Sequence, residues 1–523
     1  MSSRTMRVRD SLTLNRTSAV QENLPLFAML ESLADIKKMT SLDNDVIFYP
    51  STQKPNSLTT LGADLTSNEK GLSPYWTESC AAISSQLWLP TGIDSLDLDL
   101  SLSSIWSNRT VDQSWFSTKL FTAQQKNLPP IFSRSLLSSA LESTDSESTV
   151  TKSKKIRLWL SREQQKKVNH WLDVSRFVYN QTIAYLKEPG TVANWKAIKT
   201  DLLNSLPDFC DDVPFQIKSV AIRDACIAVR SAKAKYRKGD GTSDMRFRSR
   251  KNPVQSCYIP KSAIKPQGIY YTIIGNLRYN EVLPEDMMDS RIVRQYGKYY
   301  LAVPYKNPRH VAENQGRVVA LDPGVRNFVT FFSEDSYGWL GKAANLVIQK
   351  LCFRLDDLIS RMSKVNAKRK RSMQKAADRL RERIANLVDE LHKKIARFLC
   401  TSFDIILLPT FETSQMANKA KRRIRSKSVR QMLTLSHYKF RMFLKHKAFE
   451  LGKTVIDVCE AYTSKTVSWT GEIVSVGGRK VIQSTDGTKM DRDLNGARGI
   501  FLRAVVDTPL LRDNLSDHFV SVC

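Results

Sequence analysis

The chain lacks the features expected of a membrane protein or of a disulfide-stabilised secreted protein. Its 523 residues contain no run of about 18 apolar residues, so no segment is expected to cross a membrane. No secretory signal is recognisable at its start. The eight cysteines are scattered without the paired spacing of a disulfide framework. These absences favour a reducing compartment and exclude a disulfide scaffold.

Acidic residues are scarce relative to basic ones, and the imbalance is confined to one part of the chain. The sequence holds 80 Lys and Arg against 52 Asp and Glu, a formal net charge of +28. Residues 1 to 150 hold 12 Lys and Arg against 16 Asp and Glu, so the whole excess lies downstream. An excess of this size is typical of proteins that bind a polyanion, although a merely soluble basic surface is the simpler reading. We expect a nucleic-acid partner.

The first 150 residues differ from the rest in composition. They are rich in serine, show little periodicity and end in a segment of low complexity at 133 to 148. We therefore expect residues 1–150 to form a largely disordered or loosely ordered extension. Scattered tryptophans and the apolar stretch 24–33 leave a second interpretation open, in which short helices dock on the body or on a partner.

Three acidic residues follow apolar runs or begin a helix in the second half of the chain. Asp322 follows the run 318–321, Glu412 comes soon after the run 405–408, and Asp493 begins an apparent helix. Each has an ordinary reading by itself, as a turn, a solvated side chain or a helix cap. Strand ends at one sheet edge would bring them together, and converging carboxylates suit hard cations such as Mg²⁺. The order of the three segments predicts a two-metal phosphodiesterase site.

The sequence motifs around these acids resemble those of a known family. They look like the motifs of the RuvC nuclease in TnpB proteins, the transposon-encoded relatives of type V CRISPR effectors. The motifs are Val319–Phe328, Glu460–Thr466 and Asp491–Arg498. The entry segment at 155–180 and the basic word Arg246–Lys251 are also similar. The resemblance covers roughly residues 152 to 505, in family order.

Pro409 stands where most bacterial members carry their second acid, and proline cannot bind a metal. Glu412, three residues later, resembles the relocated glutamate of Fanzor proteins, the eukaryotic and giant-virus relatives of TnpB. The resemblance implies that Asp322 bridges two Mg²⁺ ions, with Glu412 and Asp493 holding one each. Asp491 is a weaker candidate in the same word.

The resemblance also bears on two other features: the residues that contact the phosphate to be cleaved, and a structural zinc site. Lys465 and Arg498 are candidates for neutralising charge at the phosphate. Members of the family usually carry paired Cys-x-x-Cys knuckles for zinc between the last two words, but the stretch 466–491 contains no cysteine. We predict no zinc, with the segment held by packing in a short hairpin.

The resemblance and the apolar periodicity predict an α/β fold: an RNase H-like RuvC nuclease core with a small β-barrel wedge domain that carries an inserted helical recognition lobe. The expected boundaries are 151–161 and 251–316 for the β-barrel, 162–250 for the helical lobe, 317–508 for the nuclease and 509–523 for a tail.

Basic and aromatic side chains suggest where nucleic acid binds, because aromatic rings stack on bases while guanidinium groups bind phosphates. A solvated loop is the alternative reading for the first cluster, and a nuclear localisation signal is the alternative for the two later runs. We favour nucleic-acid contact for all of them and expect a nuclear protein. The candidates are Tyr236, Arg237, Lys238, Arg246, Phe247, Arg248, Arg250, Lys251, Lys368, Arg369, Lys370, Arg371, Arg422, Arg423 and Lys465.

The function implied by the resemblance is RNA-guided cleavage of DNA by two-metal hydrolysis. The expected partners are a guide RNA, one protein chain per guide, and a double-stranded target DNA, with two Mg²⁺ ions per site. Base pairing would choose the target while the protein follows the heteroduplex backbone. Two alternatives stay open: an RNA-guided DNA-binding protein that has lost cleavage, and a guide-independent, structure-selective resolvase on the same fold.

Overall fold

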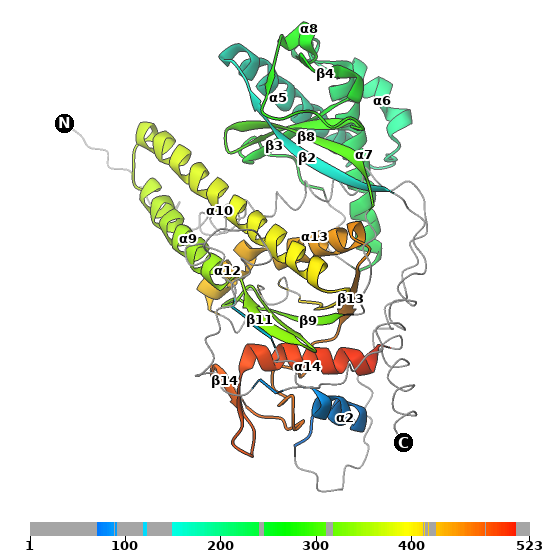
Figure 1. The fold of residues 1–523 in the computed structure, drawn as a ribbon. Coiled ribbons are helices and arrows are strands. Elements are labelled where there is room, and N and C mark those ends of the chain that lie inside the picture. The colour runs from blue at the N-terminus through cyan, green and yellow to red at the C-terminus, as the bar shows by residue number, and fades with distance from the viewer. Residues whose placement is uncertain are drawn as a thin grey trace, which may run out of the picture. The chain divides into compact units, whose positions relative to one another are not determined.

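The fold was analysed in a computed structural model, which describes residues 71–87, 89–90, 119–122, 149–239, 245–309, 317–411, 413, 417, 425–475 and 477–508. The chain divides into two compact units, one holding 149–307 and the other holding 45–148 and 308–523 (Figure 1). None of the described helices is both long and apolar enough to span a lipid bilayer.

The unit at 149–307 packs helices on one face of an antiparallel sheet. Ile156 and Leu158 alternate with outward-facing residues along strand β2 and enter the core, as the period of a strand requires. Helix α5 begins at a capping box, in which Ser161 and Gln164 satisfy each other's backbone N–H groups. The strands are β2 (Thr149–Trp159), β3 (Val254–Ile259), β4 (Ile264–Lys265), β5 (Gly268–Ile269), β6 (Arg278–Tyr279), β7 (Ser290–Gln295) and β8 (Lys298–Pro308). The helices are α5 (Arg162–Tyr185), α6 (Trp195–Asn204), α7 (Phe215–Arg237) and α8 (Tyr271–Ile274), with short 3₁₀ turns at Asp208–Cys210 and Lys261–Ala263.

The main sheet of this unit is open, which corrects the expectation of a closed barrel. Its strands run in the order β3-β7-β8-β2-β6, and no pairing joins the edge strands β3 and β6 among the residues described. One face is covered by α5 and α7, whose apolar stripe includes Trp171 and Ile217. The other face therefore carries the alternate side chains of β2 and β8.

The second unit is a mixed α/β structure around a six-stranded sheet of order β1-β11-β10-β9-β12-β13. Strands β11, β10 and β9 are antiparallel neighbours, whereas β9, β12 and β13 are parallel. The strands are β1 (Lys119–Thr122), β9 (Val318–Pro323), β10 (Val329–Ser333), β11 (Ser336–Leu340), β12 (Ile405–Pro409) and β13 (Thr454–Val458). A separate hairpin pairs β14 (Val481–Gln483) with β15 (Lys489–Asp491).

Helices cover both faces of this sheet, as its continuous apolar strands require. On β9, Val319 and Leu321 enter a core shared with α9, α10 and α13, whereas Val318 and Ala320 enter a core shared with α14 and α2. Figure 1 shows α14 on one side of the sheet and α10 with α13 on the other. The helices are α2 (Glu78–Gln86), α9 (Lys342–Met362), α10 (Ala367–Ser402), α12 (Ser426–Leu435), α13 (His437–Glu450) and α14 (Arg492–Asp507).

Two short parts of the first 150 residues are built into this unit. Strand β1 pairs with β11 as an edge strand, and α2 packs Ile83 and Leu87 into the core under α14. The loop before α2 also pairs with the segment after 466, where Ser73 N–H donates to the Gly471 carbonyl at 2.8 Å. Helix α2 corresponds to the interpretation in which short helices dock on the body, whereas the edge strand β1 was not expected. Apart from 71–87, 89–90 and 119–122, residues 1–148 lie outside the described residues, so the loosely ordered extension stays a prediction there.

Candidate active site and nucleic-acid interface

The parallel strands of the second unit end at one edge of the sheet. Asp322 lies near the end of β9, Pro409 is the last residue of β12, and Pro409 lies beside Val458, the last residue of β13. Glu460 follows Val458 by two residues. Side chains after the carboxyl ends of parallel strands gather at the same edge, which is where open α/β sheets bind ligands. Glu412 lies outside the described residues.

Helix α14 brings the last acidic word to the same place, and its two aspartates have different roles. Asp491 is the N-cap, because its Oδ1 accepts hydrogen bonds from the N–H groups of Asp493 at 2.9 Å and Leu494 at 3.2 Å. Asp493 lies in the first turn, where the only partner described for its carboxylate is Arg492 at 3.4 Å. The capping role therefore belongs to Asp491, and the Asp493 carboxylate takes no part in the cap.

Asp322 is seated directly against the backbone of α14. A β-carbon at Gly496 would lie 2.6 Å from Asp322 Oδ2 and 3.4 Å from its Cγ, so any side chain there would force the Asp322 carboxylate to move. Glycine at this position allows the carboxylate to reach the helix. Gly496 thus leaves the space that the Asp322 carboxylate occupies.

The electrostatics of this edge are those of crowded carboxylates. Burial raises the pKa of Asp322 well above its usual value, and the nearby charges of Asp493 and Glu460 raise it further. Burial also raises the pKa of Glu460. For Asp491, burial and the charge of Asp493 raise the pKa, while its capping hydrogen bonds oppose the shift. Like charges held together in this way favour either a proton or a bound cation.

The residues suit magnesium by the chemistry of their donors, since hard cations take carboxylate oxygens. Across the described ranges, no group of three His, Cys, Asp or Glu residues is already arranged as a metal-binding cluster. The carboxylates of Asp322, Asp493 and Glu460 are coupled electrostatically rather than closed into a cage.

Glu460 belongs to the motif Glu460–Thr466, but the sequence did not predict a role for it. Its signal was present, because it follows the apolar strand 454–458 just as Asp322 follows 318–321. The same rule that selected Asp322 would have selected Glu460. Proximity in sequence to Pro409 instead directed attention to Glu412.

Arg498 and Lys465, the two residues expected to neutralise charge at a phosphate, differ in their exposure to solvent. Arg498 is fully buried, and its guanidinium donates to the carbonyls of Ser84, Leu87 and Ser468, so it anchors α2 and does not face a phosphate. Burial lowers the pKa of Arg498 to about 9. This corrects the expectation for Arg498. Lys465 is exposed, in the turn after Glu460.

The segment at 466–491 is held by hydrogen bonds and packing. The Trp469 indole N–H donates to Ser484 Oγ at 3.2 Å, and Thr485 N–H donates to Glu472 Oε2 at 3.1 Å. Ile482 and Met490 are buried in the hairpin β14–β15. The hairpin differs from the expected one, which was to be packed by Trp469, Ile473, Val476 and Val481, because β14 pairs with β15 further along and Ile473 is exposed. Val476 lies outside the described residues, and the expected lack of zinc stays a prediction.

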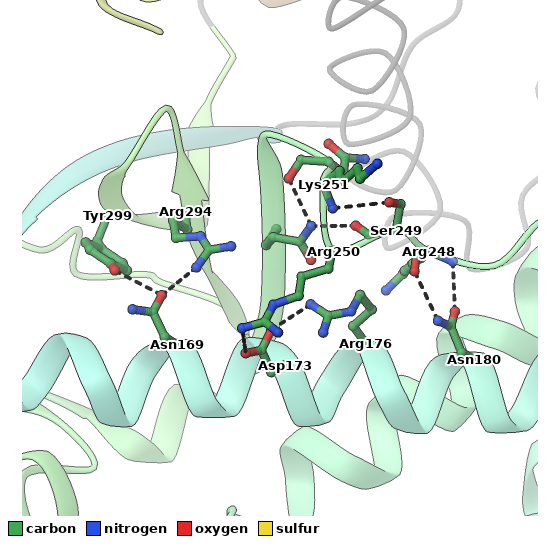
Figure 2. Close-up of polar contacts among 12 residues, drawn as sticks. Asn169, Asp173, Arg176, Asn180, Arg248, Ser249, Arg250, Lys251, Arg294 and Tyr299 are labelled. Atoms are coloured by element: carbon green, nitrogen blue, oxygen red, sulfur yellow. Dashed lines mark hydrogen bonds and ion pairs between the residues drawn. The ribbon is translucent and has the colours of Figure 1, made fainter. Parts of the chain in front are cut away.

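In the other unit, a basic loop is fastened to one face of α5. Figure 2 shows Asn169, Asp173, Arg176 and Asn180 on the same side of this helix, at helical spacing. Asn180 holds the loop by its amide, which accepts from Arg248 N–H at 2.8 Å and donates to the Arg248 carbonyl at 3.0 Å. These two hydrogen bonds fix the loop through its backbone and leave its charged groups unused.

Fixing the backbone leaves most of the loop's cations outside. Arg250 is 80% exposed, and its Nη2 lies 3.8 Å from Asp173 Oδ2, a long distance for an ion pair. Arg246 and Lys251 are exposed as well. Phe247 is 53% exposed beside them. Arg248 is the exception, because its guanidinium lies 3.6 Å from the centre of the Tyr179 ring and helps to fasten the loop.

The remaining candidates lie at helix ends. Tyr236, Arg237 and Lys238 are exposed at the end of α7, where cations also suit the helix dipole. The run 368–371 is exposed in the first turns of α10, where the dipole disfavours cations. Helix stability does not account for this second cluster, which favours contact with a polyanion. Arg422 and Arg423 lie outside the described residues.

Comparison with known proteins gives similarity to viral transposon proteins. The chain is 25% identical over 377 residues to TnpB-like protein L770 of Acanthamoeba polyphaga mimivirus, covering 66% of this chain and 72% of that one. TnpB-like protein R854 of the same virus is similar to the same extent, with 71% of its length covered. "Putative transposase A625R" of Paramecium bursaria Chlorella virus 1 is 33% identical over 238 residues, covering 44% of this chain and 54% of that protein.

Two family descriptions match parts of the chain. "Cas12f1-like, TNB domain" matches 437–500, which includes Glu460 and Asp493, and "Helix-turn-helix domain" matches 148–189. The described part of the second match consists of strand β2 and one helix, α5, with no second helix.

Solved structures with partial likeness include a Cas12f1–sgRNA–target DNA complex, at a TM-score of 0.39 and 12% identity, covering 68% of this chain and 99% of that one. The mini-RNA-guided endonuclease CRISPR-Cas_phi3 gives 0.41 and 9%, covering 71% and 95%. The chain is therefore similar in sequence to TnpB-like proteins and to a putative transposase, all of them viral.

Proposed function

We propose that the protein is an RNA-guided DNA endonuclease of transposon origin and of the Fanzor type, with an RNase H-like RuvC core. The observation that carries the proposal is the seating of Asp322 against Gly496 on α14, within electrostatic reach of Asp493 and Glu460. The mixed sheet, with its parallel strands ending at these acids, supports the RNase H-like reading. The similarity to TnpB-like proteins and to a putative transposase supports the transposon origin, and the guide RNA and DNA target are what the family resemblance implies.

Asp322, Asp493 and Glu460 would hold magnesium, with Glu412 as the acid expected from the sequence. When bound, two such ions supply an activated water and stabilise the leaving oxygen during in-line displacement at phosphorus. Asp322 would contribute to both positions because it lies between the strand edge and α14. The exposed cations Arg246, Arg250 and Lys251, in the other unit, would follow the nucleic-acid backbone.

The raised pKa values at this edge give a test of cation binding that does not depend on cleavage. A carboxyl whose folded pKa is raised contributes stability below its unfolded pKa and loses it as pH rises through the folded pKa. Mg²⁺ should therefore raise the melting temperature more at pH 8 than at pH 5.5. Asp322→Asn should remove most of this difference, and an unchanged response would contradict the cation site.

Cleavage tests the function itself and decides between the two glutamates. Purified protein with its copurified RNA should cut a guide-matched duplex in Mg²⁺ and lose the activity when the RNA is removed. Glu460→Gln and Glu412→Gln, with Glu472→Gln as a control, should be compared for rate and for target binding. We expect Glu460→Gln to lower the rate by about a hundredfold or more with binding retained, since metal ligands act on the transition state.

Two alternatives to guided cleavage are tested by the same assays, and the first of them, loss of cleavage, is suggested by Pro409. It ends the strand between β9 and β13 and offers no metal ligand. A ribonucleoprotein that binds its matched duplex without cutting would identify a programmable DNA-binding protein. Cutting of branched DNA without RNA would identify a resolvase.

A further inference from the structure

The open sheet of the unit at 149–307 has a second face, opposite the one that α5 and α7 cover. Ile156 and Leu158 of β2 point into the core, so Arg157 and Trp159 point to the opposite face. Along β8, Tyr299 and Leu301 are buried and Tyr300 alternates with them. The face away from α5 and α7 therefore carries aromatic and cationic side chains.

These side chains form one cluster. The Arg157 guanidinium carbon lies 5.2 Å from the centre of the Trp159 ring and 5.1 Å from that of Tyr300. Lys155 Nζ lies 4.2 Å from the Tyr300 ring, and Arg278 is exposed on β6 directly opposite Trp159. We call Lys155, Arg157, Trp159, Arg278 and Tyr300 the aromatic platform.

Trp159 is poorly explained by folding alone. Its side chain is 55% exposed although burial of an indole is strongly favourable, and its N–H reaches only Asn280 Oδ1 at 3.5 Å. A flat ring offered to solvent on a rigid strand is a surface on which another flat group can stack.

Arg157 supplies an independent observation. Its Nη1 is buried and makes no hydrogen bond with any described residue, although a buried unsatisfied donor costs about 1–3 kcal/mol. The rings of Trp159 and Tyr300 lie beside the guanidinium. A phosphate that binds beside the Trp159 ring would give this donor an acceptor when the guanidinium turns toward it.

We propose that the aromatic platform binds single-stranded nucleic acid, with an unpaired base stacked on Trp159 and the adjacent phosphates held by Arg157 and Arg278. Stacking platforms on exposed sheet faces bind single strands in this way, because every base has a π-face and the cations follow the backbone. A paired base has both faces covered by its neighbours. The platform therefore selects a strand end, a bulge or an unpaired segment over a continuous duplex.

The test measures binding by the full-length protein, without metal. Fluorescence anisotropy would compare 12-nucleotide single-stranded RNA, single-stranded DNA and a blunt duplex at about 300 mM salt, where non-specific phosphate binding is weakened. Trp159→Ala should weaken single-strand binding by about 5- to 100-fold and leave duplex binding within about twofold. Trp159→Phe, which keeps a stacking ring, should stay within about threefold of the native protein.

Phe215→Ala is the matched control, because Phe215 is also 55% exposed and also has a cation over its ring, Lys199 at 5.8 Å. It lies on α7, away from the platform, and its loss should change no affinity. A loss confined to RNA or to DNA would show which strand the platform takes, and either result supports the proposal. Unchanged single-strand affinity in a folded Trp159→Ala protein, or an equal loss on duplex, would overturn it.

A spectroscopic measurement decides the matter if Trp159→Ala does not fold. Stacking of a base quenches indole fluorescence, so saturating single strand should quench the native protein more than Trp159→Phe, although nine tryptophans contribute to the signal. Equal quenching in the two proteins would exclude stacking on Trp159. The acids at 322 and 493 take no part in this measurement, so its outcome is separate from that of the proposed nuclease.

Discussion

Asp322 Oδ2 lies 2.6 Å from the place that a β-carbon would occupy at Gly496. The end of strand β9 and the first turns of helix α14 are thus fitted to each other, and the absence of a side chain at Gly496 leaves the space that the Asp322 carboxylate occupies. Gly496 is buried in α14, a helix that it would ordinarily weaken by about 1 kcal/mol relative to alanine.

Gly496→Ala should separate activity from stability. The added methyl would force the Asp322 carboxylate to turn away, while alanine favours the helix, so we expect cleavage to fall by about a hundredfold or more with little change in melting temperature. Gly499→Ala is the control, because its nearest neighbours would lie at 3.3 Å, on Thr463 and Tyr75. Native cleavage by Gly496→Ala would show that the position of Asp322 is not critical.

Arg498→Met should destabilise the second unit. The change removes the donors of the Ser84, Leu87 and Ser468 carbonyls in a buried place, and we expect a loss of about 3 kcal/mol in the free energy of unfolding. Chemical denaturation measures it. Arg503→Met, one turn further along and only partly buried, should cost less than about 1 kcal/mol. Equal effects would argue against the anchoring of α2.

Asn180→Leu should loosen the basic loop without removing a charge. Both hydrogen bonds to the Arg248 backbone are lost, so residues 245–252 should become sensitive to protease, and affinity for RNA should fall about three- to tenfold. Gln181→Leu changes the exposed neighbouring residue of α5 and should have no effect. Retained protease resistance in Asn180→Leu would show that the loop is fixed by other contacts.

His392 should make the second unit sensitive to acid. Burial lowers the pKa of His392 to about 4, and its Nε2 lies 2.9 Å from the Leu435 carbonyl. Because the folded pKa is depressed, the stability is present above the unfolded value of about 6.5 and is lost as pH falls toward 4. His392→Phe should therefore lose less stability than the native protein between pH 7.5 and pH 5, by about 2 kcal/mol in denaturant titrations. Parallel pH profiles would contradict the buried neutral imidazole.

The sequence by itself determined the elements whose signals are local. Short continuous apolar runs predicted β9 and β12, the motif Asp491–Arg498 predicted the start of α14, and the excess of cations predicted a polyanion partner. Asp322 and Asp493 could be chosen in this way because each follows or begins an element with a clear pattern. These inferences needed only neighbouring residues.

Only the tertiary structure decided which distant groups meet. Glu460 reaches the field of Asp322 because β12 pairs with β13 in parallel, a register that no local pattern reveals. Arg498 does not face a phosphate, because α2, more than 400 residues away in the sequence, buries it. The barrel likewise depended on a closing pair of strands that does not form among the described residues. Pairings of this kind are set by packing over the whole chain, because the free energy of burial belongs to the assembled core and not to any one segment.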